Sequence, residues 1–342
     1  MSNSERIRQF NDGLEIQVNE KAPEILDALV DNYRTLKTSG EMIFPQEYKP
    51  DSMRPGGEYH GSHEHAMYFW NICGYMQGGT QSDFAFKKLT EIFYKHPDYF
   101  DSRLLAKTNH NEIISALKKH GLGQQGRVAN AWIENAQRLV DRYDGDPRNI
   151  FSESSSYKEC RDKICNDKKG GGFLGFQKKM TSMLFYFFTD EELIEKLNFP
   201  PPIDFHNLRV AFATEILTTN QVSFHKRDEI ENMIGKVTLD YINDTETDPI
   251  ELTNAIWGLS SNFCNQNPGN TSYKDENGKR VIRKEPEMAT KSQSKAFFRS
   301  CGACAMRAYC THCVPSGPYY TSGIIEVHDK PETIYQEQLS IF

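Results

Sequence analysis

Two lysines follow a glycine-containing turn in the segment FLGFQKKMTSMLFYFF, which spans residues 173–188. A turn is predicted at Leu174-Gly175-Phe176, and Lys179 falls in the first turn of the helix that the apolar run predicts. The N-terminus of a helix binds anions because its first N–H groups are unpaired and its dipole favours negative charge. The segment therefore predicts a phosphate-binding turn beside a lysine. The alternative is a loop with solvated lysines.

A carboxylate follows three prolines in the segment FPPPIDFHNLRV. The prolines restrict the entry to a predicted helix, so Asp204 is expected at or near its N-terminus. Asp is a frequent N-cap, and that role alone can account for the residue. A carboxylate beside a lysine can also stabilise a cationic transition state or transfer protons. Both interpretations stay open from the residues alone.

Cysteines crowd near the C-terminal end of the chain. Of eight in total, Cys301, Cys304, Cys310 and Cys313 lie within thirteen positions, and Cys264 lies upstream. The N-terminus, MSNSERIRQF, has no apolar signal segment. The lack of such a segment predicts an intracellular protein. In an intracellular protein, cysteines at short spacing indicate a structural metal site rather than disulfides. Iron–sulfur and zinc both use such thiolates.

The charge of the chain is negative overall but uneven along the sequence. A net charge of −7 and a pI of about 5.9 argue against a protein that coats nucleic acid non-specifically. Residues 158–179 nevertheless carry seven Lys or Arg against three Asp or Glu, and residues 274–299 carry eight against four. These segments fit either a protein that contacts a few phosphates or solvated surface loops.

The longest apolar run, at residues 183–188, is too short to span a bilayer. We therefore expect no membrane association and a cytoplasmic or otherwise intracellular location. The segment HGSHEH at residues 60–65 contains metal-ligand residue types, but we expect these histidines to be hydrogen-bonded or on the surface.

Helical periodicity dominates the sequence and strand-like alternation is scarce, which predicts an almost all-α fold. A polar loop is expected at residues 152–172, and irregular chain with a short strand at 323–327 is expected beyond residue 315. The predicted helices are at residues 24–37, 65–76, 83–94, 103–107, 112–119, 127–143, 177–188, the segment TDEELIEKL, the segment from FPPPIDFH to residue 217, 228–240 and 249–263.

Several segments, in order, resemble the helix-hairpin-helix DNA glycosylase superfamily, in particular its endonuclease III and adenine-glycosylase branch with an iron–sulfur cluster. FWNICGYMQGGTQSDFAFKKL resembles an early helix and a glutamine-containing loop that penetrates DNA, and KHGLGQQGRVANAWIENAQRLVDRYDGDP resembles a helix pair. FLGFQKKMTSML is similar to the hairpin LPGVGRKTANVV, and IDFHNLRV to VDTHVxRV. The resemblance covers roughly residues 60–313.

The resemblance implies a two-lobed helical fold, with a C-terminal loop whose cysteines hold a metal cluster. It implies an N-terminal extension at residues 1–60 that packs on the cluster lobe, and a helical domain at 61–217 whose hairpin lies at about 170–190. Cluster-lobe helices would follow at 218–315 and an irregular tail at 316–342.

The resemblance also implies roles for individual residues. It places Lys179 on the family's catalytic lysine and Asp204 on its catalytic aspartate. The sequence departs from the family's hairpin where Leu174 replaces a proline and Gln177 replaces the second glycine, which puts the local backbone angle and phosphate contact in question. The expected DNA-contacting residues are Gln77, Gly175, Gln177, Lys178, Arg209, Lys291, Lys295 and Arg299. The alternatives are that Gln77 caps a loop and that Arg209 serves packing.

The family's cluster motif is C-x6-C-x2-C-x5-C. The spacing Cys301-x2-Cys304-x5-Cys310 reproduces its last intervals, and the resemblance points to Cys264 as the first ligand. The first interval would then be 36 residues long, so the polar segment would be an insertion in the cluster loop. A 4Fe-4S cluster is therefore expected, with zinc as the alternative. Cys313 could replace Cys264 as the fourth ligand.

Three functions are compatible with the resemblance. The first is a base-flipping iron–sulfur DNA glycosylase, with or without lyase activity, that cleaves the N-glycosidic bond of a base in double-stranded DNA. The second is a transferase of the phage thymine-hypermodification type, similar to α-glutamyl/putrescinyl thymine pyrophosphorylase-like proteins. Such an enzyme displaces pyrophosphate from pyrophosphorylated 5-hydroxymethyluracil with an amino acid or amine. The third is a non-catalytic DNA-binding module. We expect a monomer in each case. The resemblance implies a location in the nucleoid, or in the host cytoplasm if a phage encodes the protein.

Overall fold

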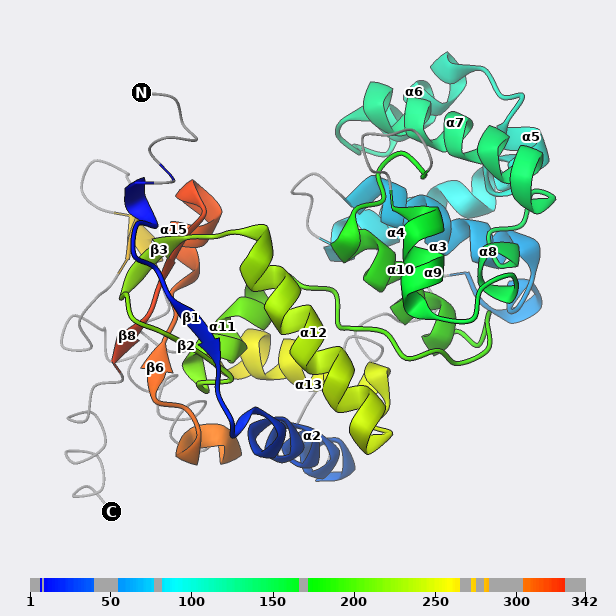
Figure 1. Ribbon diagram of the computed structural model, residues 1–342. Coiled ribbons are helices and arrows are strands. Elements are labelled where there is room, and N and C mark those ends of the chain that lie inside the picture. Colours follow the sequence, from blue (N-terminus) through cyan, green and yellow to red (C-terminus); the bar gives the residue numbers. More distant parts are fainter. Residues whose placement is uncertain are drawn as a thin grey trace. The chain divides into compact units, whose positions relative to one another are not determined.

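The computed structural model describes residues 7, 9–39, 55–76, 82–165, 172–264, 272–274, 280–282 and 304–329. The chain is mostly helical, which confirms the predicted all-α class, and the strands of the described part form short antiparallel pairs (Figure 1). Among the described residues, no helix is both long and apolar enough to cross a bilayer.

The chain divides into two compact units, Pro45–Pro202 and Met1–Phe44 with Ile203–Phe342. Its boundaries lie after residues 44 and 202, whereas the sequence suggested boundaries at residues 60 and 217. Helix α2 (Ala22–Ser39) packs against α12 (Asp228–Thr245) and α13 (Pro249–Gly258) from the second half of the chain. The N-terminal segment is thereby part of the same unit as Asp204 and the cysteines.

The unit Pro45–Pro202 is built around helix α3 (His63–Tyr75), which is buried from His65 to Tyr75. This helix packs against α4, α7 and α10. The helices of this unit besides α3 are η2 (Gly57–Tyr59), α4 (Ser82–Lys95), η4 (Pro97–Phe100), α5 (Ser102–Leu105), α6 (His110–Lys119), α7 (Gln125–Tyr143), α8 (Asn149–Ser152), α9 (Tyr157–Ile164) and α10 (Lys178–Asp190).

Two sequence expectations for this unit are wrong. Helix α9 lies within the expected polar loop, because Ser156 caps it and the apolar face Tyr157, Cys160 and Ile164 is buried. The helix expected at TDEELIEKL does not form. Helix α10 ends instead with Glu192 in the left-handed conformation (φ 54°) and with a hydrogen bond from the Leu193 N–H to the carbonyl of Phe188, at 2.8 Å.

The second unit places its core between α2, α11, α12 and α13, with buried Leu26, Val30, Leu208, Ile242 and Leu252. Its remaining elements are β1 (Ile16–Val18), α11 (Phe205–Ala213), β2 (Leu217–Thr219), β3 (Ser223–His225), the π-helical η5 (Leu259–Phe263), β4 (Ser272–Lys274), β5 (Arg280–Ile282), η10 (Ala305–Ala308), β6 (His312–Cys313), α15 (Ser316–Ser322), β7 (Ile324–Glu326) and β8 (His328–Asp329).

The strands of this unit join segments that are far apart in the sequence. β1 pairs with β2, β3 with β7, β4 with β5, and β6 with β8, all antiparallel. In Figure 1 the blue β1 runs beside the green β2, so the N-terminal segment is tied to the chain that follows α11. The short strand expected at residues 323–327 is confirmed as β7, whereas helix α15 lies where irregular chain was expected.

Candidate functional site

Asp204 is the N-cap of α11, as the sequence predicted. Its Oδ1 accepts a hydrogen bond from the backbone N–H of His206 at 2.8 Å and one from Asn207 Nδ2 at 3.4 Å. The residue is partly exposed. Capping satisfies part of the hydrogen-bonding capacity of the carboxylate, so the N-cap role and a chemical role are compatible in the same residue.

Arg209 is fully buried in the same helix. Its Nε donates to the carbonyl of Val314 at 3.0 Å and its Nη1 donates to the carbonyl of Ser260 at 3.1 Å. The guanidinium also lies over the Phe205 ring, at 4.5 Å from the centroid. The phosphate contact expected for Arg209 is therefore not available in this conformation, and the residue joins α11 to the segments before Cys264 and after Cys313.

Three of the expected cluster ligands line one pocket at the opposite end of α11. The thiols are those of Cys264, Cys304 and Cys310, and the cavity between the lining residues has a volume of about 20 Å³. The other lining residues are largely apolar: Val210, Ala213, Thr214, Leu259, Phe263, Met306 and Arg307. A single helix thus carries Asp204 at its start and part of the cysteine pocket near its end.

Short local elements bring these cysteines to the pocket. Cys264 follows the π-helical turn η5, a rare conformation that is frequent at functional sites. Cys304 caps the 3-10 turn η10, and the N–H of Cys310 closes it with a hydrogen bond of 3.0 Å to the carbonyl of Met306. Met306 is 1% exposed and anchors the turn.

The cysteine pocket contains only part of the expected ligand set. Cys301 lies outside the described residues, as do Gln77, Lys291, Lys295 and Arg299. Cys313 is buried in β6, where it pairs with His328 of β8. In the part of the chain that the structure describes, no three His, Cys, Asp or Glu side chains are grouped closely enough to bind a single metal ion.

The glycine turn lies in the other unit, between α9 and α10. Gly175 has φ +92°, a conformation that L-residues rarely adopt, so glycine is required there. Gln177 is the N-cap of α10 with an extended backbone (φ −109°, ψ 178°). The departure from the family pattern at position 177 therefore introduces no backbone strain, because any residue can adopt this conformation.

The turn is fixed by contacts that the sequence did not reveal. Asn135 of α7 accepts a hydrogen bond from the Leu174 N–H and donates one to the Leu174 carbonyl, both at 2.7 Å. The Trp70 ring packs on Phe173 and Phe176, with centroid distances of 4.7 and 4.4 Å. No sequence signal for the Asn135 contact exists, since it joins positions 39 residues apart.

Lys178 and Lys179 are exposed in the first turn of α10, where the sequence placed them. That turn has no acidic residue. Two cations at this position oppose the helix dipole, which favours negative charge there. Lys179 and Asp204 belong to different units, and their convergence stays a prediction.

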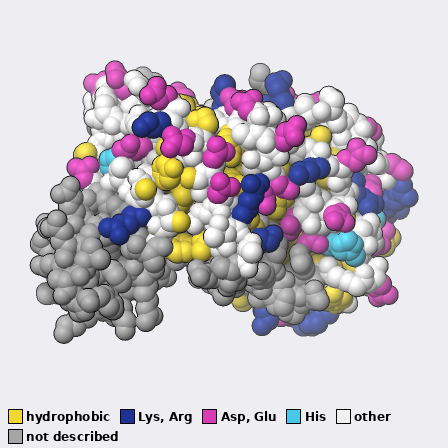
Figure 2. Space-filling model, turned by 90° about the horizontal axis from the view of Figure 1, so that it is seen from below, with side chains coloured by type: hydrophobic (Ala, Val, Ile, Leu, Met, Phe, Trp, Pro, Cys, Tyr) yellow, Lys and Arg dark blue, Asp and Glu magenta, His cyan; other side chains and the backbone are white. Residues whose placement is uncertain are grey.

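Basic residues are not segregated from acidic ones on the face shown in Figure 2. Lys and Arg side chains are interspersed with Asp and Glu among the described residues, and hydrophobic side chains gather in one region of this face. The described surface in this view therefore offers no continuous basic stripe.

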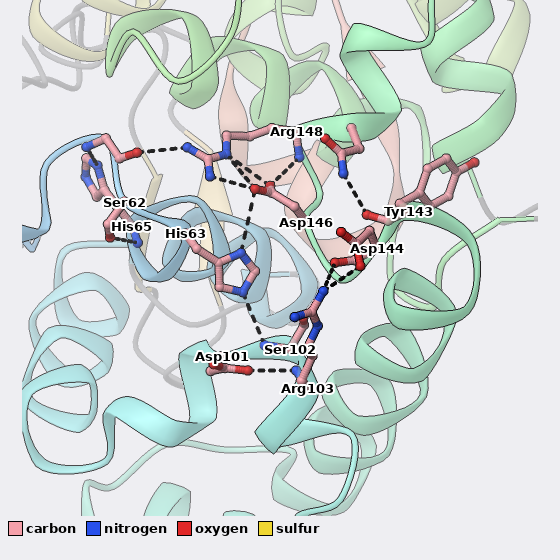
Figure 3. A network of polar contacts seen from close by, with 12 residues as sticks. Ser62, His63, His65, Asp101, Ser102, Arg103, Tyr143, Asp144, Asp146 and Arg148 are labelled. Atoms are coloured by element: carbon pink, nitrogen blue, oxygen red, sulfur yellow. Dashed lines mark hydrogen bonds and ion pairs between the residues drawn. The ribbon is translucent and has the colours of Figure 1, made fainter.

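The histidines at residues 60–65 are on the surface or hydrogen-bonded, as expected: His60 is exposed, and the rings of His63 and His65 accept hydrogen bonds. His63 Nδ1 lies 3.7 Å from Asp146 Oδ2, and its Nε2 accepts a hydrogen bond from the Ser102 N–H at 3.4 Å (Figure 3). Arg148 also pairs with Asp146 and donates to the carbonyl of Gly61. Burial opposes ionisation of Asp146, but hydrogen bonds from His63 and Arg148 hold its pKa below the ordinary value. This network is a structural clamp within one unit.

Comparison with known proteins adds no assignment: no family model matches the chain, and no curated protein matches it.

Proposed function

We propose that this protein is a DNA base-processing enzyme that extrudes a modified or damaged base, most simply an iron–sulfur DNA glycosylase. The observation that carries the proposal is the course of α11. The helix begins at the Asp204 carboxylate and contributes Val210, Ala213 and Thr214 to the pocket lined by Cys264, Cys304 and Cys310. This is the order of features that the sequence resemblance implies.

The donor chemistry of the pocket fits an iron–sulfur cluster. Three thiols face a largely apolar space, and Cys301 would be the fourth ligand. Zinc also binds four thiolates. The cluster is preferred because the spacing Cys301-x2-Cys304-x5-Cys310 matches the pattern of the iron–sulfur branch that the sequence resembles. When bound, the cluster would cross-link the segments that carry its ligands.

The hairpin between α9 and α10 supplies the second support. Lys178 and Lys179 stand at the N-terminus of a helix without an acidic residue in its first turn. A phosphate of the DNA backbone would offset the unfavourable interaction between the Lys178 ammonium and the helix dipole, which leaves Lys179 for the chemistry. The clamp by Asn135 holds the Gly175 turn in place for such a contact.

In this proposal Lys179 and Asp204 share the chemistry. The neutral amine of Lys179 attacks the sugar C1′, the base departs with the electron pair of the glycosidic bond, and Asp204 accepts the proton that the amine loses. A neutral lysine requires desolvation, which bound DNA would supply.

Mass spectrometry of nucleosides and free bases, after incubation of the protein with duplexes of defined base content, tests the proposal. A released base supports the glycosylase. A heavier nucleoside, formed with pyrophosphorylated 5-hydroxymethyluracil DNA and an amine, supports group transfer instead. Binding of duplex DNA without any product assigns the chain to the non-catalytic class and rejects the proposal.

A further inference from the structure

Two consecutive tyrosines of α15 pack against the first turn of α11, which begins after Asp204. The rings of Tyr319 and Tyr320 pack on Phe205, the residue that directly follows Asp204, with centroid distances of 5.0 and 5.4 Å. The two tyrosine rings meet edge to face at 5.4 Å. All these residues belong to one unit, so their arrangement does not depend on the position of the other.

The two tyrosines differ in their solvent exposure. Tyr319 is partly buried, and the Lys226 ammonium lies 5.0 Å from its ring centroid. Tyr320 is 63% exposed, among the most exposed large hydrophobic residues that the structure describes. Partial desolvation raises the pKa of Tyr320 and the Asp204 carboxylate raises it further. An exposed aromatic ring therefore lies within electrostatic range of this carboxylate.

The position of Tyr320 is fixed by backbone pairing. Gly323 ends α15 in the left-handed conformation (φ 72°), and its carbonyl accepts a hydrogen bond from the Lys226 N–H at 2.9 Å. Directly afterwards β7 pairs with β3, where Phe224 and Ile325 are fully buried. The α15 helix is thus joined to the core that also supports α11, and the ring is held rather than carried on a free loop.

We propose that Tyr320 is the stacking surface for the planar base of the nucleotide whose sugar is presented to Asp204. The inference rests on the proposed function and deepens it, because it names a residue that contacts the base directly. Aromatic rings stack on any base through the π-face, so a tyrosine at this place contributes affinity with little dependence on the base. Its exposure is what such a contact requires.

The test compares duplexes that differ only in one central nucleotide: a tetrahydrofuran abasic analogue, thymine, or 5-hydroxymethyluracil. Affinities are measured by fluorescence anisotropy for the wild type, Tyr320→Ala and Tyr320→Phe. The Val222→Ala variant is the matched control, because Val222 is 71% exposed in the same unit. Circular dichroism checks that each variant is folded.

We expect Tyr320→Ala to weaken binding of at least one base-containing duplex about tenfold, within the range measured for base–aromatic stacking, and to leave the abasic duplex within about twofold. Tyr320→Phe, which keeps the ring, should bind like the wild type. Three results would overturn the inference. The first is that Tyr320→Ala binds all three duplexes with the same loss of affinity, the second is that Tyr320→Phe loses as much affinity as Tyr320→Ala, and the third is that Tyr320→Ala binds with unchanged affinity. If the wild type binds none of the duplexes, the proposed function itself fails.

Discussion

Asn135 and Leu174 exchange two hydrogen bonds of 2.7 Å, so that one side-chain amide of α7 satisfies both backbone groups of the residue before Gly175. Asn135 is 2% exposed, and the neighbouring Arg138 donates to the carbonyl of Gly172. The glycine turn is therefore positioned from α7 as well as by its own sequence. This amide, with Arg138 and Trp70, supports the proposed phosphate-binding hairpin.

Replacing Asn135 with Ala should destabilise the unit Pro45–Pro202. Two hydrogen bonds are lost and the Leu174 N–H and carbonyl lose their partner, so we expect a decrease of about 2 kcal/mol or more in the free energy of unfolding. Urea denaturation measures it. Asn130→Ala, at an exposed position of the same helix, is the control. An Asn135→Ala variant as stable as Asn130→Ala would show that the clamp is not needed.

Gly175→Ala and Gln177→Gly test the backbone of the same turn. The first removes a glycine where the conformation requires one, and the second introduces a glycine where it does not. Ala at φ +92° is strained, so we expect a loss of about 1–3 kcal/mol. Gln177 is extended, so Gln177→Gly should change stability by less than about 1 kcal/mol. Thermal denaturation distinguishes the two variants. A stabilising Gln177→Gly would indicate strain at position 177 and contradict this assignment.

The turn and Asp204 could be predicted from the sequence because their determinants are local. A glycine before an apolar run and an Asp after three prolines indicate a turn and an N-cap, and the structure contains both. The contact of Asn135 with Leu174 was not predicted, because the two residues are distant along the chain. Helix α9 escaped prediction because its apolar face consists of only Tyr157, Cys160 and Ile164 among polar residues.

The cysteine site also combines residues that are close in the sequence with one that is distant. Their spacing near residues 301–313 predicted a metal site, and the structure places Cys304 and Cys310 on one pocket with the distant Cys264. The hydrogen-bond partners of Arg209 could not be predicted, because the carbonyls of Ser260 and Val314 come from segments on both sides of the cysteine loop. Motif position alone suggested a phosphate contact for this residue.

Serine substitution of the pocket cysteines should remove the bound metal. For Cys264→Ser, Cys304→Ser and Cys310→Ser we expect loss of iron and sulfide from anaerobically purified protein, together with its visible absorption, because thiolates hold such clusters. Cys73→Ser, at a buried cysteine of α3, is the matched control and should keep the metal. Colourless wild-type protein containing zinc would reject the cluster, and unchanged metal content in all three variants would reject the ligand assignment.

Protonation of Asp146 should make the free energy of unfolding decrease measurably as the pH falls into the acid range. The pKa of Asp146 is depressed in the folded state, so its contribution is fully present above the unfolded pKa of about 3.9 and is lost as pH falls toward the lower folded value. Asp146→Asn should therefore lower stability at neutral pH and flatten the dependence below about pH 5. Asp144→Asn, at an exposed carboxylate, is the control. Parallel pH profiles for wild type and Asp146→Asn would contradict the network in Figure 3.

The proposed chemistry is tested most directly by product analysis with wild type and Asp204→Asn. Asn caps a helix as well as Asp does, so this substitution preserves the N-cap of α11 and removes only the negative charge. We predict that the wild type yields a free base or a heavier nucleoside from at least one modified duplex, and that Asp204→Asn, with unchanged melting temperature, lowers the rate at least about a hundredfold. An Asp204→Asn protein that forms product at the wild-type rate would contradict the central claim.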